Sequence, residues 1–255
     1  MHKDNSQYKN LKDNFSGELY LDALHRTIYA TDASAYRMLP EAVAIPKTTN
    51  DIKLLIDFAK RNKTTLIPRA AGTSLAGQCV GKGIVVDASK HFNKIIDFNK
   101  KTKTVKVQPG VIRDQLNEFL KPHGLFFGPN TSTSNRCMIG GMVGNNSSGT
   151  TSIQYGVTRD KVLTLNTILS DGSQVRFGSI SKDKFQEKMK QNNVEGAIYK
   201  MISDEFSKET TQKEITKEFP KPNIHRRNTG YALDAIIDSE IFSNSSKPIN
   251  IAKLL

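Results

Sequence analysis

Short apolar runs alternate with an amphipathic stretch in the first third of the chain. The runs at residues 43–45, 65–67 and 84–86 are rich in β-branched side chains and predict strands. Between the first two runs, residues 48–62 repeat apolar side chains at helical spacing, and Thr48 stands three residues before an acid, in a capping-box pattern. The order of strand, helix and strand predicts a βαβ unit in a small parallel sheet.

The rest of the chain continues this alternation with more polar helices. Two apolar runs joined by the turn Asp171-Gly172 predict a β-hairpin, because Asp-Gly favours a tight turn between strands. An antiparallel second lobe follows from that hairpin. The other expected elements are a short helix at residues 19–28, a hairpin at 95–107, a helix between Pro109 and Gly124, and two polar-faced helices at 182–191 and 197–207.

A glycine-rich loop, residues 68–77, lies between the second and third predicted strands. Its glycines, Gly72 and Gly77, tolerate a positive φ, and successive exposed N–H groups in such a loop form a concave nest that favours an anion. The glycine spacing resembles a Walker A loop, but Gln78 and Cys79 stand where that motif requires Lys and then Ser or Thr. The Gly-x-Gly-x-x-Gly fingerprint is also absent from the sequence. The loop therefore predicts phosphate binding outside both common nucleotide motifs.

A second glycine-rich stretch, residues 128–149, supplies many small side chains and very little core. Its segment at residues 139–146 is expected to open a helix whose free N–H groups point at a ligand. The side chains of residues 145–148 offer donors suited to a ring edge or to hydroxyls. Two such loops in one domain indicate one elongated ligand held at two places. The alternative to a ligand site is a tight packing contact made by glycine. Against it, burying a run of asparagine and serine in a pure core costs free energy.

Four further patterns occur in order along the chain. They are Y-x-x-D-x-S-x-Y at residues 29–36, P-x-A-V-A-x-P at 40–46, S-x-x-Y-G at 152–156 and N-T-G-Y-x-L at 228–233. Together with the two loops, they resemble the FAD-binding domain of the vanillyl-alcohol-oxidase or PCMH type, found in the FAD-linked oxidases. The last pattern is similar to the D-lactate, glycolate and D-2-hydroxyglutarate dehydrogenase branch.

The resemblance implies a fold of the α+β class, a two-lobed PCMH-type FAD-binding domain. Residues 1–35 are expected to form an N-terminal helical extension and residues 36–255 the FAD-binding domain. Within that domain, residues 36–98 would make a small parallel βαβ lobe, and residues 103–238 an antiparallel sheet lobe with flanking helices. The resemblance also implies an N-terminal fragment, in which the domain is incomplete at its C-terminal end and the substrate-capping domain is absent.

The resemblance further implies FAD as a non-covalent cofactor between the lobes, with its pyrophosphate on residues 70–77 and its ring near residues 139–149 and 228–231. Covalent members often attach the ring to a histidine in the first loop, and residues 69–73 contain none. Catalytic residues stay unidentified, and no metal site is expected. The residues expected to bind the cofactor are Arg69, Ala70, Ala71, Gly72, Thr73, Ser74, Leu75, Gly77, Pro129, Thr131, Ser132, Ser134, Ile139, Gly140, Gly141, Gly144, Asn145, Asn146, Ser147, Gly149, Tyr155, Asn228 and Thr229.

A member of this branch would oxidise a D-2-hydroxy acid of the lactate, glycolate or 2-hydroxyglutarate type by hydride transfer to flavin N5. The electron acceptor stays unidentified, and R-R-x-x-G-Y-x-L-D at residues 226–234 is similar to members fused to an iron–sulfur domain. Two alternatives remain open. One is a non-enzymatic module for another nucleotide or phosphate compound, and the other is an aryl-alcohol or sugar oxidase of the same superfamily.

Composition narrows the classes of partner. The net charge of +12 would suit a protein that binds nucleic acid, but the basic residues are scattered and never form a run of five. The simpler interpretation is a positive field that attracts anionic cofactors and substrates. The sequence shows no secretory signal and no apolar stretch near the roughly 18 residues of a membrane span. Cys79 and Cys137 are too few for a disulfide framework, so buried thiols in a cytoplasmic protein are expected, with a thioether to the flavin as the alternative.

Overall fold

Two structural units make up the computed structural model, which describes residues 5–221, 223–224 and 230–255. Unit 1 comprises Met1–Phe127 and Thr131–Met142, and unit 2 comprises Gly128–Asn130 and Val143–Leu255. The main division along the chain therefore falls near residue 142, well beyond the expected boundary between residues 98 and 103. The predicted α+β class is confirmed, because each unit combines helices with β-structure.

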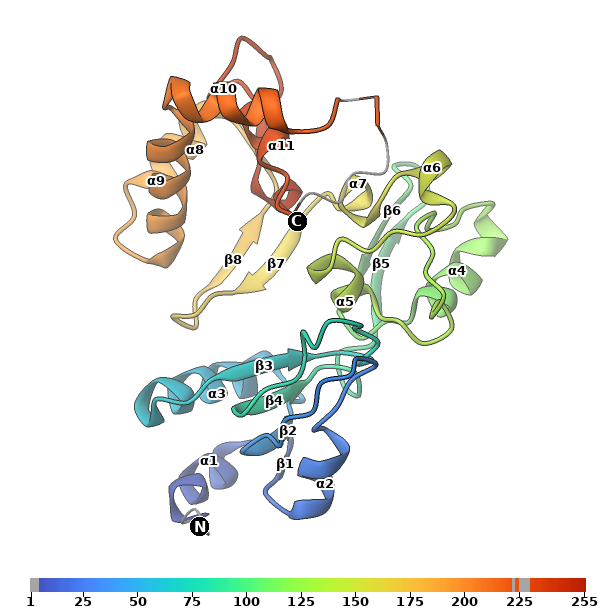
Figure 1. Ribbon diagram of the computed structural model, residues 1–255, viewed down its shortest axis with the longest axis vertical. Helices are drawn as coiled ribbons and strands as arrows, with labels where there is room; N and C mark the ends of the chain where they lie inside the picture. Colours follow the sequence, from blue (N-terminus) through green and yellow to red (C-terminus); the bar gives the residue numbers. More distant parts are fainter. Residues whose placement is uncertain (1–4, 222, 225–229) are drawn as a thin grey trace. The chain divides into compact units, whose positions relative to one another are not determined.

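Unit 1 is built around a four-stranded sheet with the strand order β1-β2-β4-β3 (Figure 1). Three of the strands are parallel, with Val43 and Ile67 both opposite Val85, while β1 runs antiparallel to β2. The predicted parallel βαβ arrangement is confirmed. The strands are β1 (Glu18–Tyr20), β2 (Ala42–Ile45), β3 (Leu66–Arg69) and β4 (Ile84–Asp87).

The helix expected at residues 19–28 is wrong in its first half. Leu19 belongs to β1, and the helix α2 (Ala23–Ile28) begins only after Asp22, whose side chain accepts the N–H of His25. The apolar stripe of this helix is not a buried face, since Leu24 is 67% exposed. The first 35 residues thus contribute an edge strand to the sheet of unit 1 as well as helices.

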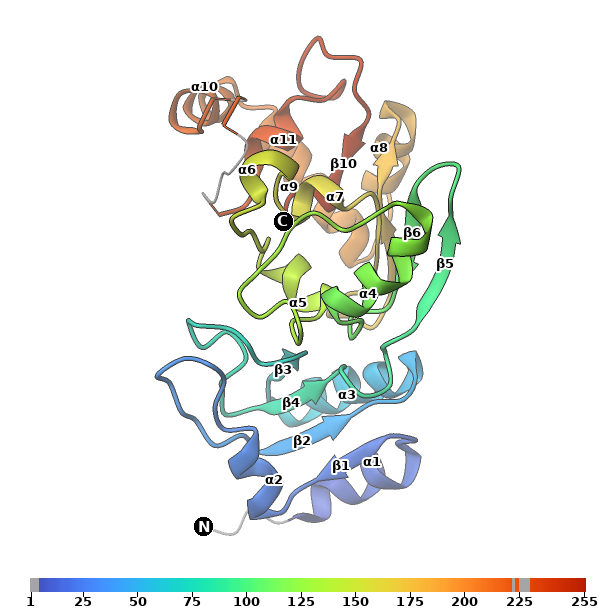
Figure 2. The same ribbon diagram turned by 90° about the vertical axis from the view of Figure 1, so that its right-hand side faces the viewer.

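Helices α1 (Lys9–Asn14) and α3 (Thr49–Asn62) pack on one face of this sheet (Figure 2). Leu11, Leu55 and Phe58 bury their side chains there among small and β-branched residues of β2 and β4. On the opposite face, a smaller cluster is formed by Ile67, Cys79, Val85 and Tyr29. The predicted capping box is confirmed, because Thr48 and Asp51 each accept the backbone N–H of the other.

The Asp51 carboxylate joins α3 to the segment before β1. It is only 1% exposed and accepts the N–H of Ser16 at 2.8 Å, the hydroxyl of Ser16 at 2.7 Å and the N–H groups of Lys47 and Thr48 at 2.9 Å each. Burial alone would raise the pKa of Asp51, but these hydrogen bonds outweigh it and hold the pKa below its ordinary value. The group is therefore a buried anion that four donors satisfy.

A β-hairpin and a helix complete unit 1. The hairpin pairs β5 (Ile95–Asn99) with β6 (Thr104–Val107), and α4 (Arg113–Leu120) packs on it through Leu116 and Leu120. A 3₁₀ turn follows α4 and ends at Gly124, whose φ of 68° is left-handed. The predicted hairpin and helix are both confirmed.

Unit 2 gathers its helices around a second hairpin, formed by β7 (Leu165–Ile168) and β8 (Gln174–Phe177). The two predicted polar-faced helices are confirmed, whereas α10 (Glu209–Glu218) was not foreseen because its sequence has a single buried apolar side chain, Ile215. None of the described helices is both long and apolar enough to span a bilayer. The remaining α-helices and strands of the described residues are α5 (Ile139–Gly144), which begins in unit 1, and α6 (Ser152–Tyr155), α7 (Thr158–Lys161), β9 (Ser179–Ile180), α8 (Lys182–Met189), α9 (Val194–Phe206), α11 (Leu233–Ile237) and β10 (Ile249–Asn250).

We expect Asp51→Ala to lower the free energy of unfolding by about 2 kcal/mol, because buried N–H groups lose their acceptor. Since the folded-state pKa lies below the unfolded value of about 3.9, this stabilisation is present above about pH 4 and is lost as the pH falls through the folded-state pKa. Urea unfolding compares the unchanged protein with Asp51→Ala at neutral pH and at about pH 3. The difference in their free energies of unfolding should be smaller at the lower pH. Asp57→Ala, an exposed carboxylate on α3, is the matched control, and an equal effect of both substitutions would contradict the prediction.

Candidate functional site

The first glycine-rich loop leaves the carboxyl end of β3 and returns to β4, all within unit 1 (Figure 1). Gly72 and Gly77 both adopt left-handed backbone conformations, with φ of 65° and 74°. The positive φ anticipated for these glycines is therefore confirmed. Ligands of open α/β sheets bind at this edge, because the loops that follow parallel strands gather there.

Residues 29–36 hold the start of this loop. Arg69 Nη1 donates to the carbonyl oxygen of Thr31 at 2.7 Å. The N–H of Ala33 donates to the carbonyl oxygen of Gly72 at 3.1 Å. The segment with the pattern Y-x-x-D-x-S-x-Y, which in the sequence indicates only a loop and a family resemblance, therefore supports the start of the glycine-rich loop through its backbone.

Two side chains of the same segment hold the end of the loop. The ring of Tyr36 lies so close to Gly77 that a Cβ there would be 2.8 Å from Tyr36 Cδ2. Asp32 Oδ2 accepts a hydrogen bond from the thiol of Cys79, with a distance of 3.6 Å between sulfur and oxygen. Burial raises the pKa of the Cys79 thiol, and the negative charge of Asp32 adds to this effect. Cys79 is therefore a protonated, buried thiol, as the sequence predicts.

The N–H groups at the centre of the loop are not used by the protein itself. Among the residues that the structure describes, none accepts a hydrogen bond from the N–H groups of residues 71–75. These residues are half-buried, except for Leu75, which is 81% exposed. The hydroxyl of Ser74 accepts the N–H groups of Ala76 and Gln78 and so tightens the turn. A row of free N–H groups beside a left-handed glycine leaves donors available for an anion, as the predicted nest requires.

The second glycine-rich stretch meets the first loop within unit 1. Its residues 131–142 run along residues 109–114 through several backbone hydrogen bonds. At the end of this contact, a Cβ on Gly141 would lie 3.8 Å from the Cβ of Ala70. The two loops, far apart in the sequence, therefore lie side by side where α5 begins.

The first N–H groups of α5 are not free, although the helix starts where the sequence predicts. The N–H of Ile139 donates to the carbonyl oxygen of Val111 at 2.9 Å, and that of Gly140 to Pro109 at 2.8 Å. The prediction that these amides point at a ligand is therefore wrong for both residues. Gly140 instead allows close packing, since its Cβ would lie 2.5 Å from the Cβ of Pro109.

In unit 2, residues 145–149 form a turn that is held from within. Asn146 has a left-handed φ of 44°, and its Oδ1 accepts the N–H of Arg159 at 2.9 Å. The hydroxyl of Thr158 donates to the carbonyl oxygen of Ser147 at 2.6 Å. Part of this asparagine and serine run therefore stabilises the protein, and direct contacts with the cofactor stay a prediction.

Residues 128–130 pack on the segment that follows this turn. The hydroxyl of Thr151 donates to Asn130 Oδ1 at 2.6 Å. Gly149 lies directly against the backbone of Asn130, so that no side chain would fit, and a Cβ on Gly128 would lie 2.6 Å from the Cβ of Tyr155. The packing alternative is therefore correct for these two glycines.

The other residues expected to bind the cofactor differ in exposure. Thr131 donates its hydroxyl to Cys137 Sγ at 3.3 Å, and Ser134 donates to Asp114 Oδ2 at 3.0 Å, so both side chains have partners in unit 1. Asn228 and Thr229 lie outside the described residues. The remaining ones are Pro129, which is buried, Thr73 and Tyr155, which are half-buried, and Ser132, Gly141, Gly144 and Asn145, which are exposed.

The described histidines lie away from the glycine-rich loops. The described histidines, His25, His91 and His123, contact Tyr20, Glu18 and Phe98 respectively. In the described part of the chain, these contacts involve neither glycine-rich loop. Among the same residues, no group of three His, Cys, Asp or Glu side chains is placed to hold a metal ion.

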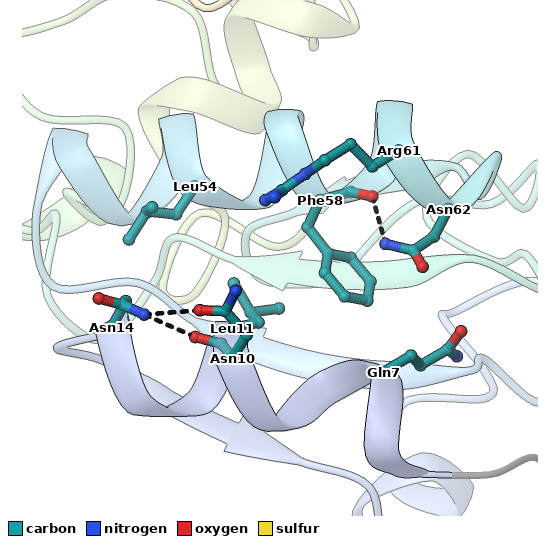
Figure 3. Close-up of a pocket in the computed structure, with 8 residues that line it drawn as sticks. All are labelled: Gln7, Asn10, Leu11, Asn14, Leu54, Phe58, Arg61 and Asn62. Carbon is teal, nitrogen blue, oxygen red and sulfur yellow. Dashed lines mark hydrogen bonds between the residues drawn. The ribbon is translucent and has the colours of Figure 1, made fainter.

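A pocket of about 250 Å³ lies elsewhere in unit 1, between α1 and α3 (Figure 3). Several of its polar side chains hydrogen-bond within their own helices, as Asn14 does with Asn10 and Asn62 with Phe58. It has no carboxylate, histidine or cysteine, so it offers no group for acid–base or nucleophilic chemistry. Its lining residues are Gln7, Asn10, Leu11, Asn14, Leu54, Phe58, Arg61 and Asn62.

Comparison with known proteins identifies the family. The sequence pattern of the family described as FAD binding domain matches residues 40–178, more than half of the chain. The chain belongs to this family. The matched region includes the first glycine-rich loop and the whole of the second stretch.

Curated relatives include dehydrogenases and oxidases of hydroxy acids. The chain is 38% identical over 229 residues to the D-2-hydroxyglutarate dehydrogenase of Pseudomonas putida, which covers 89% of the chain and 22% of that relative. It is 35% identical over 161 residues to a glycolate oxidase subunit of Bacillus subtilis, covering 62% of the chain and 34% of the subunit. The chain thus spans about a fifth of the length of the Pseudomonas relative.

Solved structures confirm the predicted PCMH-type architecture. Alkyldihydroxyacetonephosphate synthase superposes with a TM-score of 0.62 at 20% identity, over 71% of this chain and 37% of that one. p-Cresol methylhydroxylase superposes with a TM-score of 0.57 at 17% identity, over 68% of this chain and 34% of that one. At such identities, the likeness concerns the fold alone.

The geometry of the first loop fits the FAD of this family. A pyrophosphate needs several N–H donors and room for a close approach. The free N–H groups of residues 71–75 and the small side chains of Ala70 and Ala71 provide both. FAD is therefore the cofactor of the family to which this chain belongs, and its contacts with individual residues stay predictions.

We expect Gly72→Val to weaken FAD binding by at least about tenfold while the fold is retained. A left-handed φ costs an L-residue roughly 1–2 kcal/mol, and the added Cβ would lie 2.5 Å from Arg69 Nη2, a side chain held by Thr31. Flavin-fluorescence titration measures the affinity, and circular dichroism checks the fold.

Gly124→Val is the matched control for this substitution. Its φ of 68° gives similar backbone strain, but no atom lies within 4 Å of the added Cβ. The control should lower stability and leave FAD affinity within about twofold. If Gly72→Val bound FAD as tightly as the control does, the assignment of the first loop would be wrong.

We also expect FAD to be held without a covalent bond. The Cys79 thiol is buried and bonded to Asp32, and the buried Cys137 accepts the hydroxyl of Thr131, so neither sulfur is presented as a nucleophile. Acid precipitation of the loaded protein should leave the flavin colour in the supernatant. Colour in the pellet would contradict the prediction, and serine variants of each cysteine would then locate the bond.

Proposed function

We propose that this chain is the FAD-binding portion of a dehydrogenase that oxidises a D-2-hydroxy acid. The proposal rests on one observation: the two glycine-rich loops meet at Ala70 and Gly141. Together they form a surface of small residues beside the free N–H groups of residues 71–75. The similarity to the Pseudomonas putida D-2-hydroxyglutarate dehydrogenase supports 2-hydroxyglutarate as the first substrate to test.

In this proposal, the residues of the chain bind and orient the cofactor. When bound, FAD supplies the hydride acceptor for the substrate carbon. The N–H groups of residues 71–75 donate to the pyrophosphate, whose negative charges they stabilise without an intervening side chain. The small side chains of Ala70, Ala71 and Gly141 leave the surface beside the pyrophosphate open.

The proton of the substrate hydroxyl needs a base. Near the first loop, the Asp32 carboxylate accepts from Cys79 and Ser34, and Asp87 accepts from Tyr29 and Ser89, so both are already engaged. We therefore propose that the base comes from a capping domain, as the family resemblance implies. The chain alone would then bind FAD without oxidising the substrate.

The location and the electron acceptor belong to the same proposal. A cytoplasmic location is supported by two unpaired cysteines, both buried. A fused iron–sulfur domain as electron acceptor rests on the pattern at residues 226–234, which lies partly outside the described residues. The substrate test below does not depend on either point.

The cofactor is tested by titrating the purified chain with FAD and, separately, with ATP. Flavin fluorescence should reach a plateau at one FAD per chain. ATP added to the FAD-loaded chain should displace FAD only weakly. Equal affinity for the two ligands would favour the non-enzymatic nucleotide module. A chain that binds neither ligand would contradict the proposal.

The substrate class is tested with a chimera in which this chain replaces the aligned segment of the Pseudomonas putida relative. Anaerobic mixing with D-2-hydroxyglutarate should bleach the flavin absorbance of the chimera, whereas L-2-hydroxyglutarate and the chain alone should leave it oxidised. The same chimera with Gly72→Val is the control for cofactor loading. A chimera that holds FAD but responds to none of D-2-hydroxyglutarate, D-lactate and glycolate would contradict the substrate class.

A further inference from the structure

We propose that Arg69 is a positioning residue, which fixes the shape of the first loop through contacts inside the protein, and is not a ligand of the FAD pyrophosphate. The inference rests on the proposed function, in which residues 71–75 hold the pyrophosphate. It corrects the simplest view of this arginine as a positive charge that pairs with phosphate.

The guanidinium of Arg69 has protein partners on several sides. Nη1 donates to the carbonyl oxygen of Thr31 at 2.7 Å, and the guanidinium carbon lies 5.1 Å from the centroid of the Tyr29 ring. Nη2 occupies the space next to Gly72, where a Cβ would lie only 2.5 Å away. The arginine therefore occupies the space that a side chain at residue 72 would need.

The Tyr29 ring is itself fixed by a buried carboxylate. Its hydroxyl donates to Asp87 Oδ2 at 2.6 Å, and Asp87 is 6% exposed. Burial raises the pKa of Tyr29, and the hydrogen bond to Asp87 raises it further, so the hydroxyl stays a donor. Asp87 lies opposite Arg69 in the register of β3 and β4, which closes a chain of contacts from the sheet to the loop.

This arrangement requires a guanidinium and not simply a positive charge. A planar guanidinium can donate at its edge to Thr31 while its face lies on the Tyr29 ring. The ammonium of lysine is a point charge on a flexible stem and cannot make both contacts in the same geometry. A residue that paired directly with phosphate would tolerate lysine better, because lysine is itself a common phosphate ligand.

The two roles are separated by FAD titrations of Arg69→Lys and Tyr29→Phe in the full chain at several salt concentrations. We expect each substitution to weaken FAD binding by at least about tenfold. The dependence of affinity on salt should keep the slope of the unchanged protein, because no contact between a cation and phosphate is removed. Thermal unfolding of the FAD-free proteins monitors the fold in parallel.

Two substitutions in unit 1 provide matched controls. Arg26→Lys removes a guanidinium that donates to the carbonyl oxygen of Pro40 at 2.7 Å, and Tyr20→Phe removes a hydroxyl that donates to Glu18 at 2.7 Å. Neither residue contacts the first loop in the described structure. Both controls should keep FAD affinity within about twofold of the unchanged protein.

The results separate the possible failures. The inference would be overturned if Arg69→Lys and Tyr29→Phe both kept the FAD affinity of the unchanged protein. It would also be overturned if the FAD affinity of Arg69→Lys depended less steeply on salt. If Arg69→Lys does not fold, Tyr29→Phe, which loses a single hydroxyl, decides the matter by the same criterion. An unchanged protein that binds no FAD would overturn the proposed function itself and not the role of Arg69 alone.

Discussion

A loop that leaves several N–H groups without an acceptor has few hydrogen bonds of its own to hold its shape. In the first glycine-rich loop, the N–H groups of residues 71–75 have no acceptor among the described residues, so its conformation depends on contacts from outside. Residues 29–36 supply most of these contacts, at the start of the loop through Thr31 and at its end through Tyr36. Other parts of unit 1 thus support the loop while its central N–H groups stay without an acceptor among the described residues.

Glycine serves two distinct purposes in this chain. At Gly72 and Gly77, the backbone is left-handed, and side chains of the protein occupy the space that a Cβ would need. At Gly140 and Gly149, glycine mainly allows two backbone segments to pack closely. A glycine-rich stretch therefore does not by itself indicate a ligand surface, because some of its glycines only allow close packing.

Local patterns in the sequence were sufficient for much of the fold. The βαβ unit, the two larger hairpins and the capping box at Thr48 follow from periodicity and turn chemistry, which act over a few residues. The strand at Glu18–Tyr20 could not be found in this way, because three residues show no period and their partner, β2, lies far along the chain. The same limit explains the N–H groups of Ile139 and Gly140, whose acceptors belong to another segment.

The candidate cofactor residues separate along the chain in a way that sequence alone does not reveal. The first loop, its supports in residues 29–36 and residues 131–142 of the second stretch all belong to unit 1. The residues expected near the flavin ring from Asn145 onward, with Tyr155, belong to unit 2. In the proposed binding mode, the pyrophosphate would thus be recognised within unit 1, through backbone N–H groups. In unit 2, the side chain of Asn146 and the carbonyl oxygen of Ser147 already have structural roles, so contacts of these residues with the ring stay a prediction. If this binding mode holds, substitutions in the first loop should act on cofactor affinity, whereas substitutions in the turn at residues 145–149 should also lower the stability of unit 2, because its contacts with Thr158 and Arg159 would be lost.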